Sequence, residues 1–494
     1  MTRIFCYSIV LFCIVNLSLN LNPGAKMRVT QKWVDYVKTV GIQFLREMLR
    51  NEPLPDITGA THMFGAVDYF ITGIQVDMLE LHKSTATLMV GTDVEVSFDD
   101  ASAKAHGKWR VKHWLVKNKG RFALSLTGVN IKATLTTFQD DSNRPGVLLS
   151  KCQSNVQRAE IKFSGSLSWL YNLFSVFLEK PICDNLSKRL CHRVEEEIAE
   201  LQRVLKTFRA HARIGALADV DYSLLMPPQV TTEHIDLDLK GMVSPVGSPS
   251  ESPFTPRTIP MPNSNQFMLL LGFSESFFHS VSFTYFTKRV LRKTITHKES
   301  PKTPWLKTSD YVKQIPEISN HYPKAQPMRM SFYATKVPMV TLTPDRLHLE
   351  LFGLVEATAL LPDSNTKPLF AVNLGVSLSS SDLRVSDFNL TGSFRLNSYQ
   401  LLSISSSLGF VENAAFDEPV QFMLISEVLP ALNEGLMSGI PVPSLANISL
   451  TDTEVKINQG SVLISTDMVY LPFMKSLNGR PRKDGVGRRS ASPA

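Results

Sequence analysis

Residues 94–98 read VEVSF, residues 122–126 read FALSL and residues 129–135 read VNIKATL. Apolar and polar side chains alternate in all three segments, so every second residue faces the same side of the chain. A period of two is typical of an antiparallel sheet with one buried face. The stretch from Asp68 to Phe138 is therefore predicted to form such a sheet.

Helical patterns flank this sheet on both sides. A first helix is expected after Thr30, its N-cap, and should end near Asn51 and Pro53. A second, much longer helix is expected from about Ser166 to Lys206, where apolar residues recur mostly every four positions. The apolar positions are Val34, Val37, Gly41, Phe44, Leu45 and Met48 in the first helix, and Leu170, Phe174, Leu178, Ile182, Leu186, Leu190, Val194, Ile198 and Leu201 in the second.

The second half of the chain repeats this order with different residues. A strand from Gln266 to Phe273 precedes a helix capped by Ser274, and alternating segments follow between Val337 and Phe410. A last helix is expected from about Glu418 to Ser438. The order helix, sheet, helix thus occurs twice, which predicts an α+β protein built from two similar halves.

A proline-rich segment separates the halves. Residues 241–262 read GMVSPVGSPSESPFTPRTIPMP, with six prolines, a composition that disfavours helices and central strands. We interpret it as a linker between domains at 22–240 and 263–474. Residues 1–21 carry Arg3 and an apolar run from Ile4 to Val15, typical of a signal peptide. This signal peptide predicts a secreted protein. No later stretch has 18 uninterrupted apolar residues, so the mature chain is expected to be soluble.

The net charge of +7 comes mostly from the two ends of the chain. Residues 475–494 contribute +5 and are expected to be a disordered basic tail, whereas residues 22–240 sum to only +3. This balance does not favour a nucleic-acid partner. The sequence contains no HExxH, GxSxG, P-loop or paired CxxC motif. We therefore expect no catalytic residues, no metal site and no cofactor.

The stretch from Ala105 to Arg121 is AHGKWRVKHWLVKNKGR. Seven cations and no acidic residue lie between Lys104 and Arg121. Alternation places Trp109, Val111 and His113 on one face, with cations on the other, and a hairpin turn is expected at Lys117–Gly120. Clustered cations beside tryptophans suit an anionic, amphiphilic target. The alternative is a solvated strand face with its tryptophan in the core.

Three cysteines remain after removal of the signal peptide: Cys152, Cys183 and Cys191. In an oxidising compartment two of them should pair. Cys183 and Cys191 lie on one predicted helix, about 12 Å apart at about 1.5 Å of rise per residue, too far for a disulfide. The bond therefore involves Cys152 and one of the other two.

Several motifs, in this order along the chain, resemble the family of bactericidal/permeability-increasing protein, lipopolysaccharide-binding protein and the plasma lipid-transfer proteins. The resemblance extends from Asn22 to Tyr470. The surroundings of Pro181–Cys191 and of Leu463–Asp467 resemble the member called BPI fold-containing family C. The motifs are NPGAKMRVTQK at 22–32, LPD at 54–56, HGKWRVK at 106–112, GSLSWLYNLF at 165–174, DYSLL at 221–225, LKG at 239–241, LNE at 432–434 and GIPVP at 439–443.

The resemblance implies a boomerang of two pseudo-symmetric, elongated barrel-and-helix domains joined by a central antiparallel sheet. Each domain would hold phospholipid acyl chains in an apolar pocket, and the protein would not be an enzyme. The family's disulfide would join Cys152 to Cys191 and leave Cys183 free. Its cationic, lipopolysaccharide-binding tip would fall on Lys108, Arg110, Lys112, Lys117 and Lys119.

Further candidate residues come from the helices and the sequons. Arg46 and Arg50 are candidates to join the head-group site. Val37, Phe44, Phe174 and Phe177 are candidates to line the first pocket, with ordinary core packing as the alternative. Asn185, Asn389 and Asn447 stand in glycosylation sequons.

Three functions compete. The first is a secreted lipid binder that recognises lipopolysaccharide or anionic membranes in innate, antimicrobial defence. The second is an extracellular lipid carrier without microbial specificity, and the third is a secreted hydrolase.

Overall fold

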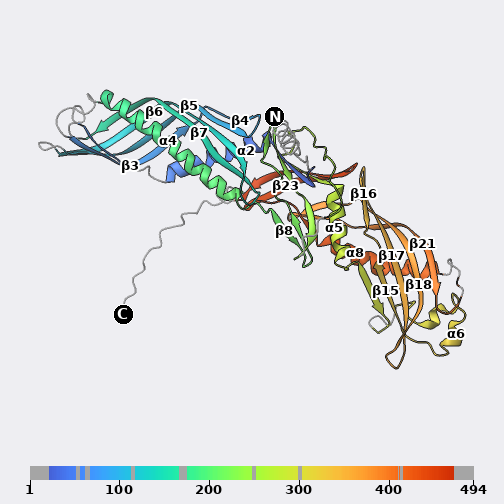
Figure 1. The fold of residues 1–494 in the computed structure, drawn as a ribbon. Helices are drawn as coiled ribbons and strands as arrows, with labels where there is room; N and C mark the ends of the chain where they lie inside the picture. The colour runs from blue at the N-terminus through green and yellow to red at the C-terminus, as the bar shows by residue number, and fades with distance from the viewer. Residues whose placement is uncertain are drawn as a thin grey trace, which may run out of the picture.

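The structure is a computed structural model that describes residues 22–51, 56–61, 67–112, 117–165, 175–247, 252–298, 303–409, 411 and 416–471. The predicted signal peptide and basic tail lie outside these residues. Figure 1 shows an elongated molecule with one curved sheet toward each end and a further sheet between them. The predicted two-part α+β architecture is confirmed.

The N-terminal part is one antiparallel sheet with two helices. Its strand order is β2-β3-β5-β6-β7, with β4 paired to β5. The predicted alternation is confirmed, because Val94, Phe122 and Leu124 are buried. The elements are α2 (Gln31–Asn51), β2 (Ile57–Thr61), β3 (Val67–Glu80), β4 (Lys83–Met89), β5 (Asp93–Lys112), β6 (Lys117–Gln139), β7 (Pro145–Ser164) and α4 (Ser175–Leu205).

Both predicted helices of this part are present. Helix α2 begins directly after Thr30, as expected. Helix α4 is 31 residues long and packs along β7. Its end at Leu205 matches the prediction, whereas the expected first turns at 166–174 lie outside the described residues.

The C-terminal part repeats this plan. Its sheet runs β14-β15-β17-β18-β21, with β16 paired to β17, the same pattern as in the first part. The predicted helix at 418–438 consists of two α-helical segments joined by a π-helical turn, η3. The elements are α5 (Glu275–Thr287), β14 (Arg292–Thr296), η1 (Thr308–Tyr311), α6 (Ile318–His321), β15 (Met328–Ala334), β16 (Met339–Thr343), β17 (Arg346–Leu360), β18 (Thr366–Ser380), β21 (Arg395–Ser406), α7 (Asp417–Met423), η3 (Leu424–Val428) and α8 (Leu429–Met437).

A six-stranded central sheet joins the two parts. At its centre β1 and β13 pair antiparallel, with Met27 opposite Leu271. Each of these strands runs directly into the first helix of its own part, so the repeat is built around this pair. The order is β10 (Gln229–Val230), β11 (His234–Leu239), β1 (Ala25–Thr30), β13 (Leu269–Ser274), β24 (Ser461–Tyr470) and β23 (Ile448–Asn458).

Ser274 occupies the predicted N-cap position of α5, but its hydroxyl does not cap the helix. The Ser274 Oγ donates instead to the carbonyl of Gly24, at 3.0 Å. The hydroxyl thus ties the start of β1 to the end of β13.

Two small three-stranded sheets lie next to each other at the junction. A buried aromatic ring connects them, because Tyr222 is fully buried and donates from Oη to the carbonyl of Pro441 at 2.7 Å. The sheets are β12-β9-β8, from β8 (His211–Ile214), β9 (Ala218–Asp221) and β12 (Met242–Pro245), and β19-β20-β22, from β19 (Arg384–Ser386), β20 (Asn389–Thr391) and β22 (Ile440–Pro441).

The proline-rich segment is ordered where it is described. Its start forms β12 at the edge of a small sheet, a position that tolerates proline. Residues 252–262, here called the strap, lie on the central sheet. A Cβ added to Gly272 of β13 would lie 2.5 Å from Cγ2 of Ile259, so a glycine permits this close contact.

Candidate functional site

Five cations stand on the outer face of strands β5 and β6, and we call them the cation ladder. They are Lys108, Arg110 and Lys112 of β5 and Lys119 and Arg121 of β6. All five are exposed. The register places Lys108 opposite Arg121 and Arg110 opposite Lys119. Cations therefore face cations across the two strands.

No ion pair within the described part of the chain neutralises any of these five side chains. Like charges directly opposite each other in a sheet lower its stability. The arrangement concentrates positive potential on one surface, which suits the binding of an anion.

The opposite face of the same strands is a rigid core. Trp109 is only 4% exposed, and its Nε1 donates to the carbonyl of Arg121 at 3.1 Å. Its ring meets Phe163 edge to face at 5.5 Å. A Cβ on Gly120 would lie 2.1 Å from the carbonyl oxygen of Ser164. Trp109 therefore belongs to the core, the second of the two sequence interpretations, and it holds the ladder's strands in place.

The remaining predicted head-group residues are only partly described. Lys112 pairs in register with Lys117, but the Lys117 and Arg50 side chains lie outside the described residues, as do His113 and Trp114. Arg46 is exposed on α2, the helix that packs against β3 and β4.

The inner face of the N-terminal sheet packs against α4. The apolar cluster between them includes Ile182, Leu186 and Leu190 of the helix. Of the predicted pocket residues, Val37 is 36% exposed. Phe174 and the side chains of Phe44 and Phe177 lie outside the described residues.

A narrow apolar cavity lies between the C-terminal sheet and the helix that crosses it. Three of its residues, Leu424, Val428 and Leu432, lie on the helix predicted at 418–438. Its free volume is about 10 Å³, the size of about one water molecule. Acyl chains would therefore require the helix to move from the sheet. The cavity is lined by Leu351, Val376, Leu378, Leu396, Leu424, Val428, Leu429 and Leu432.

The helix is irregular and is less buried toward its C-terminal end. No residue of α8 is fully buried, and the π-helical turn η3 connects it to α7. A π-helical turn interrupts the regular hydrogen-bond pattern of an α-helix and often marks a functional position. The sequence predicted this helix but not its interruption.

A disulfide joins Cys152 of β7 to Cys191 of α4, the pairing that the family resemblance implies. Beside it, the backbone N–H of Val156 donates to Ser187 Oγ at 3.1 Å. Cys183 is free and buried, and burial raises the pKa of its thiol. These contacts fix α4 against the sheet.

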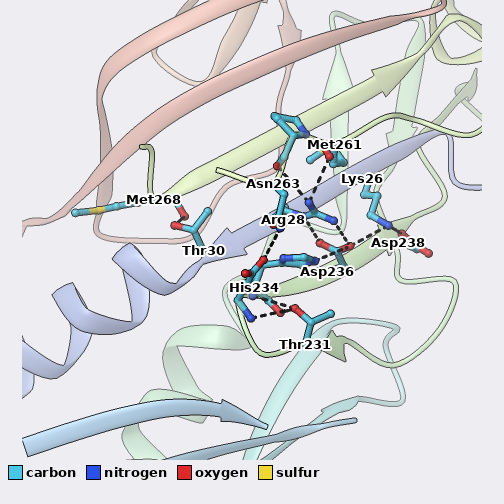
Figure 2. Close-up of polar contacts among 12 residues, drawn as sticks. Lys26, Arg28, Thr30, Thr231, His234, Asp236, Asp238, Met261, Asn263 and Met268 are labelled. Atoms are coloured by element: carbon cyan, nitrogen blue, oxygen red, sulfur yellow. Dashed lines mark hydrogen bonds and ion pairs between the residues drawn. The ribbon is translucent and has the colours of Figure 1, made fainter. Parts of the chain in front are cut away.

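A buried ionic cluster stabilises the central sheet (Figure 2). Arg28 of β1 donates to Asp236 of β11, from Nε at 2.7 Å and from Nη2 at 2.8 Å. Its Nη1 donates to the carbonyls of Met261 and Pro262. Lys26 adds a second cation, 3.1 Å from Asp236. Arg28 thus fastens the strap to the sheet.

Metal-binding clusters and membrane-spanning helices are both absent from the described residues. These residues contain no group of three or more His, Cys, Asp or Glu side chains that could hold a metal ion. They also contain no helix with the length and apolar character that crossing a membrane requires.

An elongated α+β molecule with two apolar helix–sheet interiors and a cationic strand pair has the organisation of a two-domain lipid-binding protein. The chain belongs to the LBP / BPI / CETP family. The model of the family's N-terminal domain matches residues 34–206, and that of its C-terminal domain matches residues 212–470. Proteins of this family bind lipids and are not enzymes.

Similar proteins match along nearly their whole length. The bactericidal permeability-increasing protein of Sebastes schlegelii is 32% identical, over 94% of this chain and 99% of its own. The BPI fold-containing family C protein of Homo sapiens is 27% identical, over 92% and 90%. A crystal structure of lipopolysaccharide binding protein superposes with a TM-score of 0.64 at 25% identity, over 91% and 99%.

Proposed function

We propose that this protein is a secreted lipid binder of innate defence, which recognises lipopolysaccharide or other anionic lipids. Phospholipid acyl chains enter the apolar helix–sheet interiors, and the cation ladder contacts the head groups. The observation that carries the proposal is the register of β5 and β6, which sets Lys108 against Arg121 and Arg110 against Lys119. Such an arrangement is unfavourable for the fold alone.

The family context supports the anionic ligand. The relatives named lipopolysaccharide-binding protein match over more than 90% of this chain. Phosphate groups accept charge-assisted hydrogen bonds from lysine and arginine. The ladder presents five such donors on one exposed surface.

Secretion is part of the proposal, with residues 1–21 as the signal peptide. The Cys152–Cys191 disulfide supports an oxidising compartment. Among the sequons, Asn447 is exposed at a turn, whereas the Asn389 side chain is partly buried and donates to the carbonyl of Asp387 at 3.0 Å. We therefore expect the glycan on Asn447. The Asn185 side chain lies outside the described residues.

The direct test is to extract bound lipid from the secreted protein, identify it by mass spectrometry and measure rebinding. Delipidated protein should take up phospholipid and should bind lipopolysaccharide more tightly than neutral vesicles. Failure to take up any phospholipid would contradict the pocket. Equal binding to anionic and neutral lipids would favour the carrier without microbial specificity.

A further inference from the structure

Positive and negative charges are strongly separated along the second half of the chain. Residues 286–336 contain eleven Lys or Arg and three Asp or Glu, a net charge of +8. Residues 337–474 contain five basic and fourteen acidic residues, a net charge of −9. The basic segment runs from the end of α5 through β14, η1 and α6 to β15.

Backbone contacts bring three parts of this basic segment side by side. The N–H of His297 donates to the carbonyl of Met328 at 3.1 Å, and the N–H of Met328 donates to Leu306 at 2.8 Å. Lys307 forms a bridge with Pro327. Lys298, Lys307, Lys324 and Arg329 therefore cluster around the start of β15, and we call these four the C-terminal basic surface.

No ion pair involves these four side chains within the described ranges, and the three lysines are exposed. Two nearby acidic side chains accept hydrogen bonds from backbone N–H groups. Asp310 accepts from the N–H of Lys307 at 3.0 Å, and Asp363 accepts from the N–H of Asn365 at 3.1 Å.

Apolar side chains accompany the cations. Val312, beside the exposed Lys313, is 39% exposed, and the ring of Trp305 is only partly buried against the core. A partly exposed tryptophan beside lysines suits the interface of a membrane. A sulfated polysaccharide would need no such apolar groups. Lysine also acts as a point charge rather than as a bidentate ligand, which suits a diffuse anionic surface.

We propose that the C-terminal basic surface is a second binding surface for anionic membranes. It lies in the part of the molecule opposite the one that holds β5 and β6, as the position of α6 in Figure 1 shows. The molecule therefore carries an anionic-lipid surface in each domain and links two vesicles. This linking rests in part on the proposed function of the cation ladder, whereas binding at the second surface does not.

The experiment uses full-length protein and vesicles of phosphatidylcholine with phosphatidylglycerol. The C-end variant is K298Q/K307Q/K324Q, and the N-end variant is K108Q/R110Q/K119Q. A matched control, R346Q/R384Q/R395Q, removes three exposed cations elsewhere in the C-terminal part. Vesicle sedimentation measures binding, and dynamic light scattering measures the linking of vesicles.

Each single variant should still bind vesicles but should no longer link them, and the control should do both. In the N-end background, the C-end substitutions should weaken binding about a hundredfold, since each of the three cations contributes roughly fivefold near an anionic surface. If the N-end variant alone loses all vesicle binding, the proposal of a second binding surface is wrong, whereas the proposed role of the cation ladder is supported. If the N-end variant binds and links like wild type, the ladder takes no part in vesicle binding, and the loss of binding in the combined variant decides whether the second surface does.

Two further results would overturn the inference. Binding of the combined variant at the level of the N-end variant would show that these lysines have no part in membrane binding. The protein could also be retained on a sulfated-polysaccharide resin in a way that depends on Lys298, Lys307 and Lys324. If these lysines had no effect on vesicle binding at the same time, the partner of this surface would be a polysaccharide and not a membrane.

Discussion

The guanidinium of Arg28 in β1 holds the carboxylate of Asp236 in β11 through two hydrogen bonds, of 2.7 and 2.8 Å. Arg28 is 9% exposed and Asp236 is 8% exposed. The same guanidinium reaches two carbonyls of the strap. One buried side chain therefore links strand β1 of the central sheet both to β11 and to the strap.

Removing Arg28 should destabilise the protein strongly. Arg28→Met leaves a buried carboxylate without its main partner, which costs about 3–5 kcal/mol. Lys26, which lies 3.1 Å from Asp236, remains in this variant and should keep the loss of unfolding free energy near the lower end of that range. Urea unfolding measures the change. As a control, Lys32→Met removes the more exposed pair with Asp467 and should cost at most about 1 kcal/mol.

The same substitution should loosen the strap, because Arg28 Nη1 no longer donates to it. Trypsin should then cleave faster after the exposed Arg257 in the Arg28→Met variant. An unchanged cleavage rate in a variant with reduced stability would show that other contacts hold the strap.

Mild acid should weaken the attachment of the strap at a second residue, His279 of α5. Burial lowers the pKa of His279 below its ordinary 6.5, although the backbone of Val340 and the charge of Glu275 oppose this. Its ring lies 4.4 Å from that of Phe254 in the strap. Because the folded state disfavours the proton, stability is present above the ordinary pKa and is lost as pH falls below it.

His279→Phe should therefore reduce the loss of unfolding free energy from about pH 7 to about pH 5. The loss should not vanish, since burial also lowers the pKa of His234. Urea midpoints at several pH values test this. Parallel curves for wild type and variant would rule out His279 as a source of the pH dependence.

The disulfide should contribute substantially to the stability of the N-terminal domain. Cys152 and Cys191 are 39 residues apart, and closing a loop of that size contributes about 4 kcal/mol in the chain-entropy model. Cys152→Ala should lose about this amount in unfolding measurements. Cys183→Ala removes a buried free thiol and serves as the control, since it leaves the cross-link intact. Peptide mapping without reduction should find the 152–191 pair in both wild type and control.

Local patterns in the sequence predicted most of the fold. Alternation at Val94, Phe122 and Leu124 located the strands, and Thr30 and Ser274 marked the starts of two helices. Such signals depend only on neighbouring residues, so they can be read without the tertiary structure. The role of Ser274 could not be predicted, because its partner Gly24 is 250 residues away in the chain.

The candidate sites could be predicted only where their residues are close together in the sequence. The cations of the ladder are visible as a run, but only the strand register sets Lys108 against Arg121. The C-terminal basic surface combines residues from separate segments, so its four cations do not form a local motif. The strap was interpreted as a simple linker, because nothing near Met261 in the sequence indicates its contact with Arg28.

Neutralising the cation ladder should weaken lipopolysaccharide binding without lowering the stability of the fold. The variant K108Q/R110Q/K119Q should bind lipopolysaccharide about a hundredfold more weakly, since each cation near an anionic surface contributes roughly 1 kcal/mol. Its unfolding free energy should stay constant or rise by a few tenths of a kcal/mol, because like-charged cross-strand pairs are removed. Wild-type binding should also fade from about 0.1 M to about 1 M salt.

The matched control is K151Q/K188Q/R189Q, which removes three exposed cations from the same domain. It keeps the ladder and the basic tail, so a general charge effect would weaken both variants equally. Uptake of neutral phospholipid should be unchanged in both, because the apolar interiors lie on the other face of the sheet. Equal loss of lipopolysaccharide binding in the two variants would remove the specific role of the ladder, and the plain lipid carrier would become the better description.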